Sequence, residues 1–139
     1  MNQTVREVMT SNPVCMSPST SLSEAAMQMR ESDIGDVLLV ENSELRGIIT
    51  DRDIAIRAVA DGRDPRATTI KDIASGKVHT ISADSPVSDA VSLMRKHALR
   101  RLPVTDGNKP VGIVSIGDLA ASVDRGSALA DISMAPPTR

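Results

Sequence analysis

The sequence contains no phenylalanine, tyrosine or tryptophan. The hydrophobic core must therefore consist of Leu, Ile, Val, Ala and Met side chains. Any base that the protein binds can be covered only by aliphatic side chains or by histidine. This absence disfavours binding of single-stranded nucleic acid, because proteins of that class usually stack the bases on aromatic side chains.

Cysteine and histidine are also scarce. The single cysteine, Cys15, excludes an intrachain disulfide, and its neighbours Val14 and Met16 favour a small packed hydrophobe over a nucleophile. His79 and His97 have no further Cys or His at metal-ligand spacing. No nucleophile with a general base and no glycine-rich phosphate loop is visible. The sequence therefore predicts no catalytic residues and no metal site, and we expect the protein not to be an enzyme.

Charge of one sign and long apolar runs are missing as well. The net charge of the 139 residues is −2, which favours neither nucleic acid nor an anionic membrane as a partner. No apolar run approaches the roughly 20 residues that span a bilayer. The N-terminus lacks the basic and apolar regions of a signal peptide. We expect a cytoplasmic protein.

An internal repeat is present instead. Shifting the sequence by 65 residues aligns its two halves without a gap. One aligned pair of segments has apolar residues at i, i+3, i+4 and i+7: Leu22, Ala25, Ala26 and Met29 align with Val87, Ala90, Val91 and Met94. This spacing predicts two amphipathic helices. Thr20 or Ser21 is expected to cap the first helix, and Ser85 followed by Pro86 the second.

Two short apolar runs follow each predicted helix. They are residues 37–40 and 47–50 in the first copy and residues 102–104 and 111–115 in the second, with polar turns between them. A further helix is expected to start near Asp53 and near Asp118. The predicted fold class is α+β, with two tandem β-α-β-β-α repeats. Neither copy alone would bury both faces of its sheet, so we expect the copies to pack sheet to sheet in one pseudo-two-fold module.

The repeats set the expected domain boundaries. The first repeat with its following helix is residues 1–62, the second is residues 63–125, and residues 126–139 form a C-terminal tail that frays. Residues 61–65, Asp-Gly-Arg-Asp-Pro, are predicted to link the copies.

A short signature also occurs in both copies. It is a glycine, two apolar residues, Ser or Thr, two variable residues and Asp, at residues 47–53 and 112–118. With the repeat layout, it resembles a CBS-domain pair, also called a Bateman module, over about residues 4–122. Residues 50–54 are similar to stand-alone two-repeat bacterial proteins of the hypoxic response protein type. The resemblance implies a cleft between repeats that holds an adenosyl ligand: AMP, ADP or ATP, with NAD or S-adenosylmethionine also possible.

The resemblance implies that each site takes its ribose-binding Asp from one repeat and its opening strand from the other. The primary site would contain Thr50, Arg52, Asp53, Val78, His79, Thr80, Leu99, Arg100 and Arg101. A carboxylate accepts hydrogen bonds from a vicinal diol, and guanidinium groups suit phosphate. Three alternatives stay open: a solvated basic loop for Arg100 and Arg101, an ion pair for Arg52, and a half-exposed structural role for His79.

The second site would contain Val14, Cys15, Ile34, Gly35, Asp36, Ser115 and Asp118. Asp36 stands where Arg101 stands in the other repeat, and a carboxylate repels phosphate. We therefore expect this site to be empty or to hold an uncharged or less phosphorylated adenosyl ligand. Alternatively, Asp118 only caps a helix.

These features predict a regulatory module that binds an adenine nucleotide and signals to a separate effector protein. We expect a homodimer formed through the apolar residues 54–60, although these residues could instead be buried within the subunit. The alternative is a ligand-free platform for protein interaction. A metal-dependent or nucleic-acid-binding regulator is disfavoured by composition.

Overall fold

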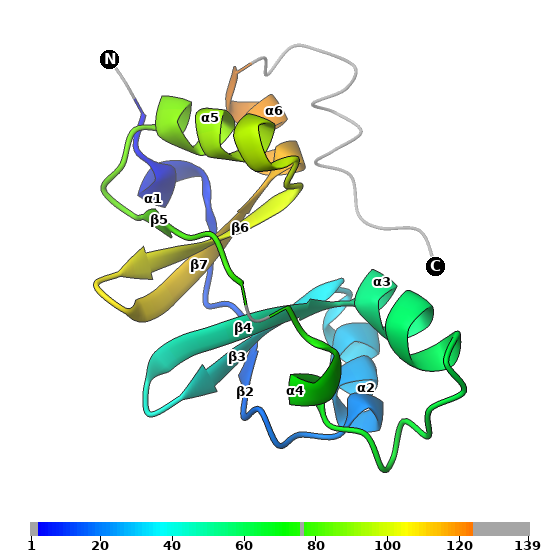
Figure 1. Cartoon of the computed structure of the whole chain (residues 1–139). Coiled ribbons are helices and arrows are strands. Elements are labelled where there is room, and N and C mark those ends of the chain that lie inside the picture. The colour runs from blue at the N-terminus through cyan, green and yellow to red at the C-terminus, as the bar shows by residue number, and fades with distance from the viewer. Residues whose placement is uncertain (1–2, 76, 124–139) are drawn as a thin grey trace. The chain divides into compact units, whose positions relative to one another are not determined.

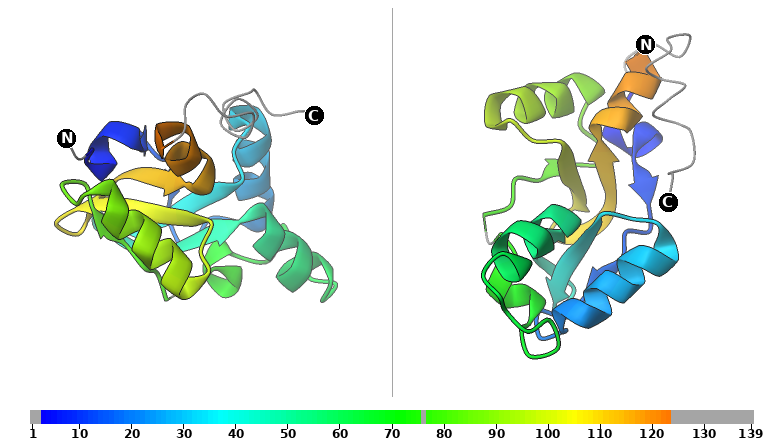
Figure 2. Two further views of the ribbon diagram at one scale, coloured as in Figure 1. Left: turned by 90° about the horizontal axis from the view of Figure 1, so that it is seen from above. Right: turned by 90° about the vertical axis from the view of Figure 1, so that its right-hand side faces the viewer.

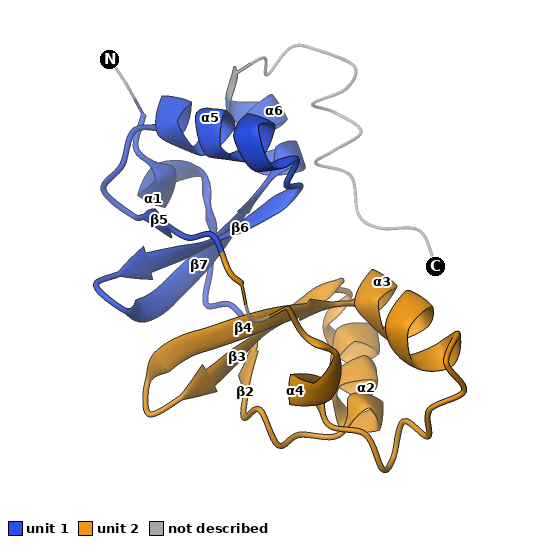
Figure 3. Cartoon of the chain, in the orientation of Figure 1, with its two compact units in different colours: residues 1–13, 79–139 blue, residues 14–78 orange. Residues whose placement is uncertain are grey.

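The computed structural model describes residues 3–75 and 77–123, which form short helices and two sheets (Figures 1 and 2). Contacts divide the chain into two compact units (Figure 3). Unit 2 is the continuous stretch of residues 14–78, whereas unit 1 combines residues 1–13 with residues 79–139. The predicted α+β class is confirmed, and the predicted tail, residues 126–139, lies outside the described residues.

Unit 2 has a three-stranded sheet in the order β2 (Cys15–Met16), β3 (Asp36–Glu41), β4 (Glu44–Thr50). β2 and β3 are parallel, and β3 and β4 form an antiparallel hairpin. The helical elements are α2 (Leu22–Ser32), α3 (Asp51–Asp53), the π-helix η1 (Ile54–Val59) and α4 (Ile70–Ile73). They lie on one side of the sheet (Figure 1).

Unit 1 has a four-stranded sheet in the order β1 (Thr10–Ser11), β7 (Lys109–Ser115), β6 (Arg101–Asp106), β5 (Ile81–Ser82). Its central hairpin is antiparallel and its outer pair β5–β6 is parallel. The helices are α1 (Val5–Val8), α5 (Val87–His97) and α6 (Ile116–Val123). Each copy therefore contains its predicted amphipathic helix and its two predicted strands.

Each unit has its own aliphatic core between helices and sheet. In unit 2 the buried cluster includes Leu22, Val37 and Ile49, and in unit 1 it includes Ala90, Leu102 and Val114. The helical stripe predicted from the sequence forms the helix side of both clusters. Ala26 is the exception, because its side chain is exposed.

The helix ends follow local sequence rules with one exception. Ser21 is the N-cap of α2, as predicted, and its hydroxyl accepts a hydrogen bond from the Glu24 amide at 3.2 Å. The prediction for α5 is wrong by one residue: Pro86 itself occupies the N-cap position, with φ −67° and ψ 150°. The carbonyl of the preceding residue, Ser85, accepts a hydrogen bond from the Val5 amide at 2.8 Å.

The contact units are offset from the sequence repeats. Residues 1–13 precede the first repeat's strands but pack in unit 1, where Thr10 pairs with Ile113. Residues 66–78 pack in unit 2, where the Ile70 amide donates to the Thr20 carbonyl at 2.8 Å. The predicted boundary at residues 62 and 63 thus describes the duplication, whereas the predicted linker, residues 61–65, lies inside unit 2.

Candidate functional site

The Thr50 and Asp53 side chains of the first signature form a reciprocal capping box between β4 and α3. The Asp53 amide donates to Thr50 Oγ1 at 3.1 Å, and Asp53 Oδ2 accepts from the Thr50 amide at 2.9 Å. The second carboxylate oxygen, Oδ1, lies 3.9 Å from Arg57 Nε, and the Asp53 side chain is 18% exposed. The cap therefore fixes the orientation of the carboxylate while leaving Oδ1 with one long, partly exposed ion pair.

The second signature has the same geometry. The Asp118 amide donates to Ser115 Oγ at 3.1 Å, and Asp118 Oδ2 accepts from the Ser115 amide at 2.9 Å. The sequence left a helix N-cap as the alternative for Asp118; the structure gives Asp118 a capping role, but at the third position of the box, as it does for Asp53.

Unit 2 brings half of each predicted site together. Asp36 at the start of β3 pairs with Thr50 at the end of β4, and the Gly35 carbonyl accepts the Asp51 amide at 3.0 Å. The primary-site residues Thr50, Arg52 and Asp53 therefore adjoin the second-site residues Ile34, Gly35 and Asp36. Val14 and Cys15 of the second site and Val78 of the primary site also belong to unit 2.

Unit 1 carries the complementary halves. Arg101 pairs with Ser115 across β6 and β7, and the Arg100 carbonyl accepts the Ile116 amide at 3.0 Å. Leu99, Arg100 and Arg101 of the primary site thus adjoin Ser115 and Asp118 of the second site. His79 and Thr80 also belong to unit 1 and lie just before β5. Each predicted site therefore draws its residues from both units.

The imidazole of His79 stacks on that of His97 in unit 1. The ring centroids are 3.8 Å apart and the planes differ by 19°. His97, at the end of α5, is half-exposed, with one face of its ring against His79. Partial burial and the positive charges of His79 and Lys96 lower the pKa of His97. The pair was missed because His79 precedes β5 and His97 ends α5, and no local sequence pattern links these two positions.

The connection between the long helix and the next strand differs in charge between the units. In unit 1 it carries Lys96, Ala98, Arg100 and Arg101, and the equivalent positions of unit 2 are Glu31, Asp33, Gly35 and Asp36. One connection is therefore basic and the other acidic. An anionic group is favoured only at the first.

Cys15 does not have the surroundings of an activated thiol. It is exposed on β2, and partial burial of the sulfur raises the pKa of its thiol above the ordinary value of 9.0. A raised pKa lowers the fraction of reactive thiolate at neutral pH. Cys15 is thus a strand residue of the second predicted site without the features of a nucleophile.

The described part of the chain also bears on metal binding and membrane insertion. No group of three or more His, Cys, Asp and Glu side chains in residues 3–75 and 77–123 is arranged to hold a metal ion. Within the same residues, no helix has the length and apolar character needed to cross a membrane.

The two units and their matching capping boxes define a duplicated α+β protein with one signature per repeat. The family model for the CBS domain matches the chain twice, over residues 5–59 and 70–125. The chain therefore belongs to the CBS-domain family and carries a pair of these domains, which confirms the resemblance read from the signature.

Several known proteins are similar over most of the chain. CBS domain-containing protein YhcV of Bacillus subtilis is 39% identical over 133 residues, which cover 93% of this chain and 94% of that protein. Hypoxic response protein 1 of Mycobacterium tuberculosis is 34% identical over 118 residues, covering 84% and 82%. The stand-alone two-repeat type predicted from residues 50–54 is thus confirmed.

Two solved structures extend the comparison. Hypoxic Response Protein I with two coordinated zinc ions superposes with a TM-score of 0.77 at 34% identity, covering 85% of this chain and 97% of that one. The CBS domain pair of protein MJ0100, in complex with 5′-methylthioadenosine and S-adenosyl-L-methionine, has a TM-score of 0.82 at 28% identity, covering 91% and 100%.

Proposed function

We propose that this CBS-domain pair is a non-catalytic sensor. It binds an adenine nucleotide such as AMP, ADP or ATP in a cleft between its repeats, and it signals to a separate partner protein. NAD and S-adenosylmethionine are further candidates of the same adenosyl class. In this proposal the protein samples the cytoplasmic nucleotide pool.

The geometry of Asp53 is the observation that carries the proposal. Its Oδ2 is fixed by the Thr50 amide at 2.9 Å, so the carboxylate is oriented before any ligand arrives. Its Oδ1 has only the 3.9 Å contact with Arg57, which is weak enough to be replaced by ribose hydroxyl donors. The adenosyl ligands bound to the similar MJ0100 pair support the same ligand class.

Arginine supplies the phosphate end of the proposed site. Arg100 and Arg101 stand in the basic helix–strand connection of unit 1, and Arg52 lies in the first turn of α3 in unit 2. Guanidinium groups bind phosphate oxygens bidentately. His79, stacked on His97, adds a flat ring that suits the base or a phosphate. The second site lacks this set and has Asp36 instead, so it would accept only an uncharged or less phosphorylated adenosyl ligand.

A ligand-free interaction platform is the second candidate, and one observation favours it. Both capping boxes are complete without a ligand, so the signature residues have a structural role wherever nucleotide is absent. Under this alternative, the exposed apolar side chains would dock a protein rather than respond to a nucleotide.

The same apolar side chains support a homodimer. Ile56 and Val59 of η1 are 51% and 67% exposed, and Met27 of α2 is 47% exposed, whereas Ala58 is buried. Residues 54–60 therefore bury only part of their apolar surface within the subunit. In the proposal a second copy covers the rest, and Val59→Asp should dissociate the dimer in sedimentation equilibrium while the monomer stays folded.

A thermal-shift experiment tests nucleotide binding. Ligand at about 100 times its Kd should stabilise the fold by roughly 2.7 kcal/mol. AMP, ADP, ATP, NAD and S-adenosylmethionine are added separately to the full chain at millimolar concentration. Asp53→Ala and Arg101→Ala should each abolish the shift.

Asp118→Ala is the matched control, because it removes an equivalent capping box and leaves the primary site intact. It should lower the melting temperature of the free protein as Asp53→Ala does, yet retain the nucleotide-induced shift. No shift of the unmodified protein with any of the five ligands would favour the platform. An equal loss in Asp118→Ala would show that the two sites are ranked wrongly.

A further inference from the structure

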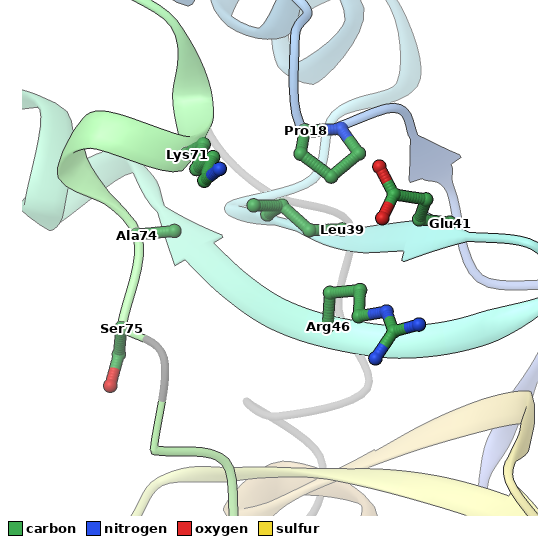
Figure 4. A pocket seen from close by; sticks show the side chains of 7 residues that line it. All are labelled: Pro18, Leu39, Glu41, Arg46, Lys71, Ala74 and Ser75. Atoms are coloured by element: carbon green, nitrogen blue, oxygen red, sulfur yellow. The ribbon is translucent and has the colours of Figure 1, made fainter.

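Unit 2 contains a pocket of about 560 Å³ between the β3–β4 hairpin and the α4 segment (Figure 4). Its lining is Pro18, Leu39, Glu41, Arg46, Lys71, Ala74 and Ser75. Leu39 lies in the middle, with Lys71, Ala74 and Ser75 on one side and Glu41 and Arg46 on the other (Figure 4). None of the residues of the proposed nucleotide site is among them.

Unit 1 has a larger side chain at the position equivalent to Ala74. Ala74 of unit 2 is equivalent to Met9 of unit 1, and Met9 packs on the buried cluster of that unit. The Met9 side chain lies directly against Gly112 on β7. A Cβ atom built on Gly112 would lie 2.5 Å from Met9 Sδ and 3.0 Å from its Cγ. Methionine thus fills the space beside the strand glycine of unit 1.

Unit 2 leaves that volume open. Gly47 is the equivalent of Gly112, but a Cβ there would meet only the Ser75 carbonyl oxygen at 2.9 Å and Leu39, with no atom of Ala74 among its nearest neighbours. A second difference lies on the strand. Val111 packs on the core of unit 1, whereas its equivalent, Arg46, is exposed at the pocket rim.

The charges around the pocket differ in the same way. In unit 1, Arg6 pairs with Asp84 at 3.4 Å and with Asp106 at 3.8 Å. Their equivalents in unit 2 are Lys71, Ser19 and Glu41. Among the described residues, neither Lys71 nor Glu41 has an ion pair within 4.0 Å, while Arg46 pairs with Glu44 at 3.3 Å. Two cationic side chains and one carboxylate therefore surround an apolar floor.

We propose that this pocket binds a small carboxylate with a short unbranched apolar tail. The tail lies against Leu39 and Ala74, and the carboxylate pairs with Arg46, on the side of Leu39 opposite Lys71. A simple aliphatic acid and a free α-amino acid share this chemistry. The amino acid would place its ammonium group near Glu41. The pocket volume lies within the roughly 300–1,000 Å³ of small-molecule sites.

An NMR titration of the full chain with hexanoate and with L-norleucine tests the proposal. The backbone amide signals of Leu39, Ala74 and Ser75 should shift saturably, and those of Met9 and Thr10 in unit 1 should not. Tighter binding of norleucine identifies an amino-acid site, and equal or tighter binding of hexanoate identifies a simple acid site. If neither probe gives a saturable shift at these three residues, the proposal is wrong.

Two substitutions copy unit 1 into unit 2. Ala74→Met should fill the pocket and weaken probe binding by at least about tenfold, whereas the same change at Ala26, an exposed alanine of α2 outside the pocket, should leave probe binding unchanged. Arg46→Val, a change at an exposed position, should also weaken binding, and it preserves the test if Ala74→Met fails to fold. Unchanged probe affinity in both Ala74→Met and Arg46→Val would overturn the proposal. Asp53→Ala should bind the probes normally, so failure here and failure of the nucleotide proposal are distinguishable.

Discussion

The two units have the same backbone arrangement but differ in the side chains near the ends of their helices and strands. Both have a capping box with hydrogen bonds of 2.9 and 3.1 Å, and both close their long helix with a left-handed residue at φ 53°, Asp33 or Ala98. The side chains at the ends have diverged: unit 1 has a methionine where unit 2 has a pocket, and a basic connection where unit 2 has an acidic one. The duplication has therefore kept the hydrogen bonds of the capping boxes, while the side chains at the helix–strand connection and at the Met9 and Ala74 positions have diverged.

Among substitutions that test this difference between the units, replacement of Met9 should have the largest effect on stability. Met9→Ala should lower the free energy of unfolding by about 2 kcal/mol, the lower end of the range for buried methionines, because Met9 is partly buried against the core of unit 1 and lies beside Gly112. Urea denaturation measures the loss. Ala74→Met serves as the reciprocal variant and should change stability by no more than about 1.5 kcal/mol, since space for the side chain already exists. A Met9→Ala variant as stable as the unmodified protein would mean that methionine does not fill unit 1.

The two strand glycines give the next largest effect. Gly112→Ala should cost about 1–3 kcal/mol, because its Cβ would overlap Met9 Sδ and the Thr10 carbonyl oxygen, which lie 2.5 and 2.8 Å away. Gly47→Ala meets a backbone oxygen at a similar distance, Ser75 at 2.9 Å, and should cost less only by the contribution of the Met9 side chain. The combination of Met9→Ala with Gly112→Ala should be less destabilising than the sum of the single variants, as a double-mutant cycle would show. Equal costs at both glycines would contradict the proposed difference in packing.

The capping boxes should respond alike in the two units. Thr50→Ala and Ser115→Ala should each destabilise the free protein by about 0.5–2 kcal/mol, because each leaves a helix amide without its side-chain acceptor. Thermal unfolding without nucleotide compares the two variants. Thr50→Ser and Ser115→Thr are the matched controls and should retain most of the stability. A marked inequality between the two alanine variants would show that one signature is held by something other than its cap.

The smallest expected effect is the titration of His97, which has Ser32 as its equivalent in unit 2. Its lowered pKa means that the folded protein disfavours the protonated ring. Stability is therefore unaffected well above the ordinary pKa of 6.5 and is lost as pH falls through 6.5 toward the folded-state value, because the unfolded chain takes up the proton first. NMR should show His97 titrating below 6.5, and His79→Ala should raise its pKa. An unchanged pKa in His79→Ala would exclude the influence of the neighbouring ring.

Local features of the fold were predictable from the sequence because they depend on neighbours in the chain. The helical stripes, the Ser21 cap and the glycine signatures follow from spacing and turn chemistry alone. The error at Pro86 is local, because Pro86 is the equivalent of Ser21 and takes the same N-cap position without a side-chain hydrogen bond. The exchange of residues 1–13 and 66–78 between units, in contrast, depends on tertiary contacts that no local pattern encodes.

The site was predictable only in part. Alignment of the repeats identified Asp53 and Asp118 and their hydroxyl partners, which the structure joins in capping boxes. The stacking of His79 on His97 depends on how the segment before β5 packs against the end of α5, which is a tertiary contact. The pocket of unit 2 was overlooked because alanine at residue 74 is unremarkable alone. The importance of Ala74 is visible only in the structure, where its equivalent, Met9, packs beside Gly112.

The path of the chain makes unit 2 an insertion within unit 1. β1 pairs with β7, so Thr10 must wait for Ile113 before the sheet of unit 1 is complete. All strands of unit 2, in contrast, come from one uninterrupted stretch of 65 residues, 14–78. Because closing a long loop costs entropy before any contact repays it, unit 2 is expected to fold first, during synthesis at the ribosome. The N-terminal strand would meanwhile stay unpaired, which makes it the segment most in need of protection in a nascent chain.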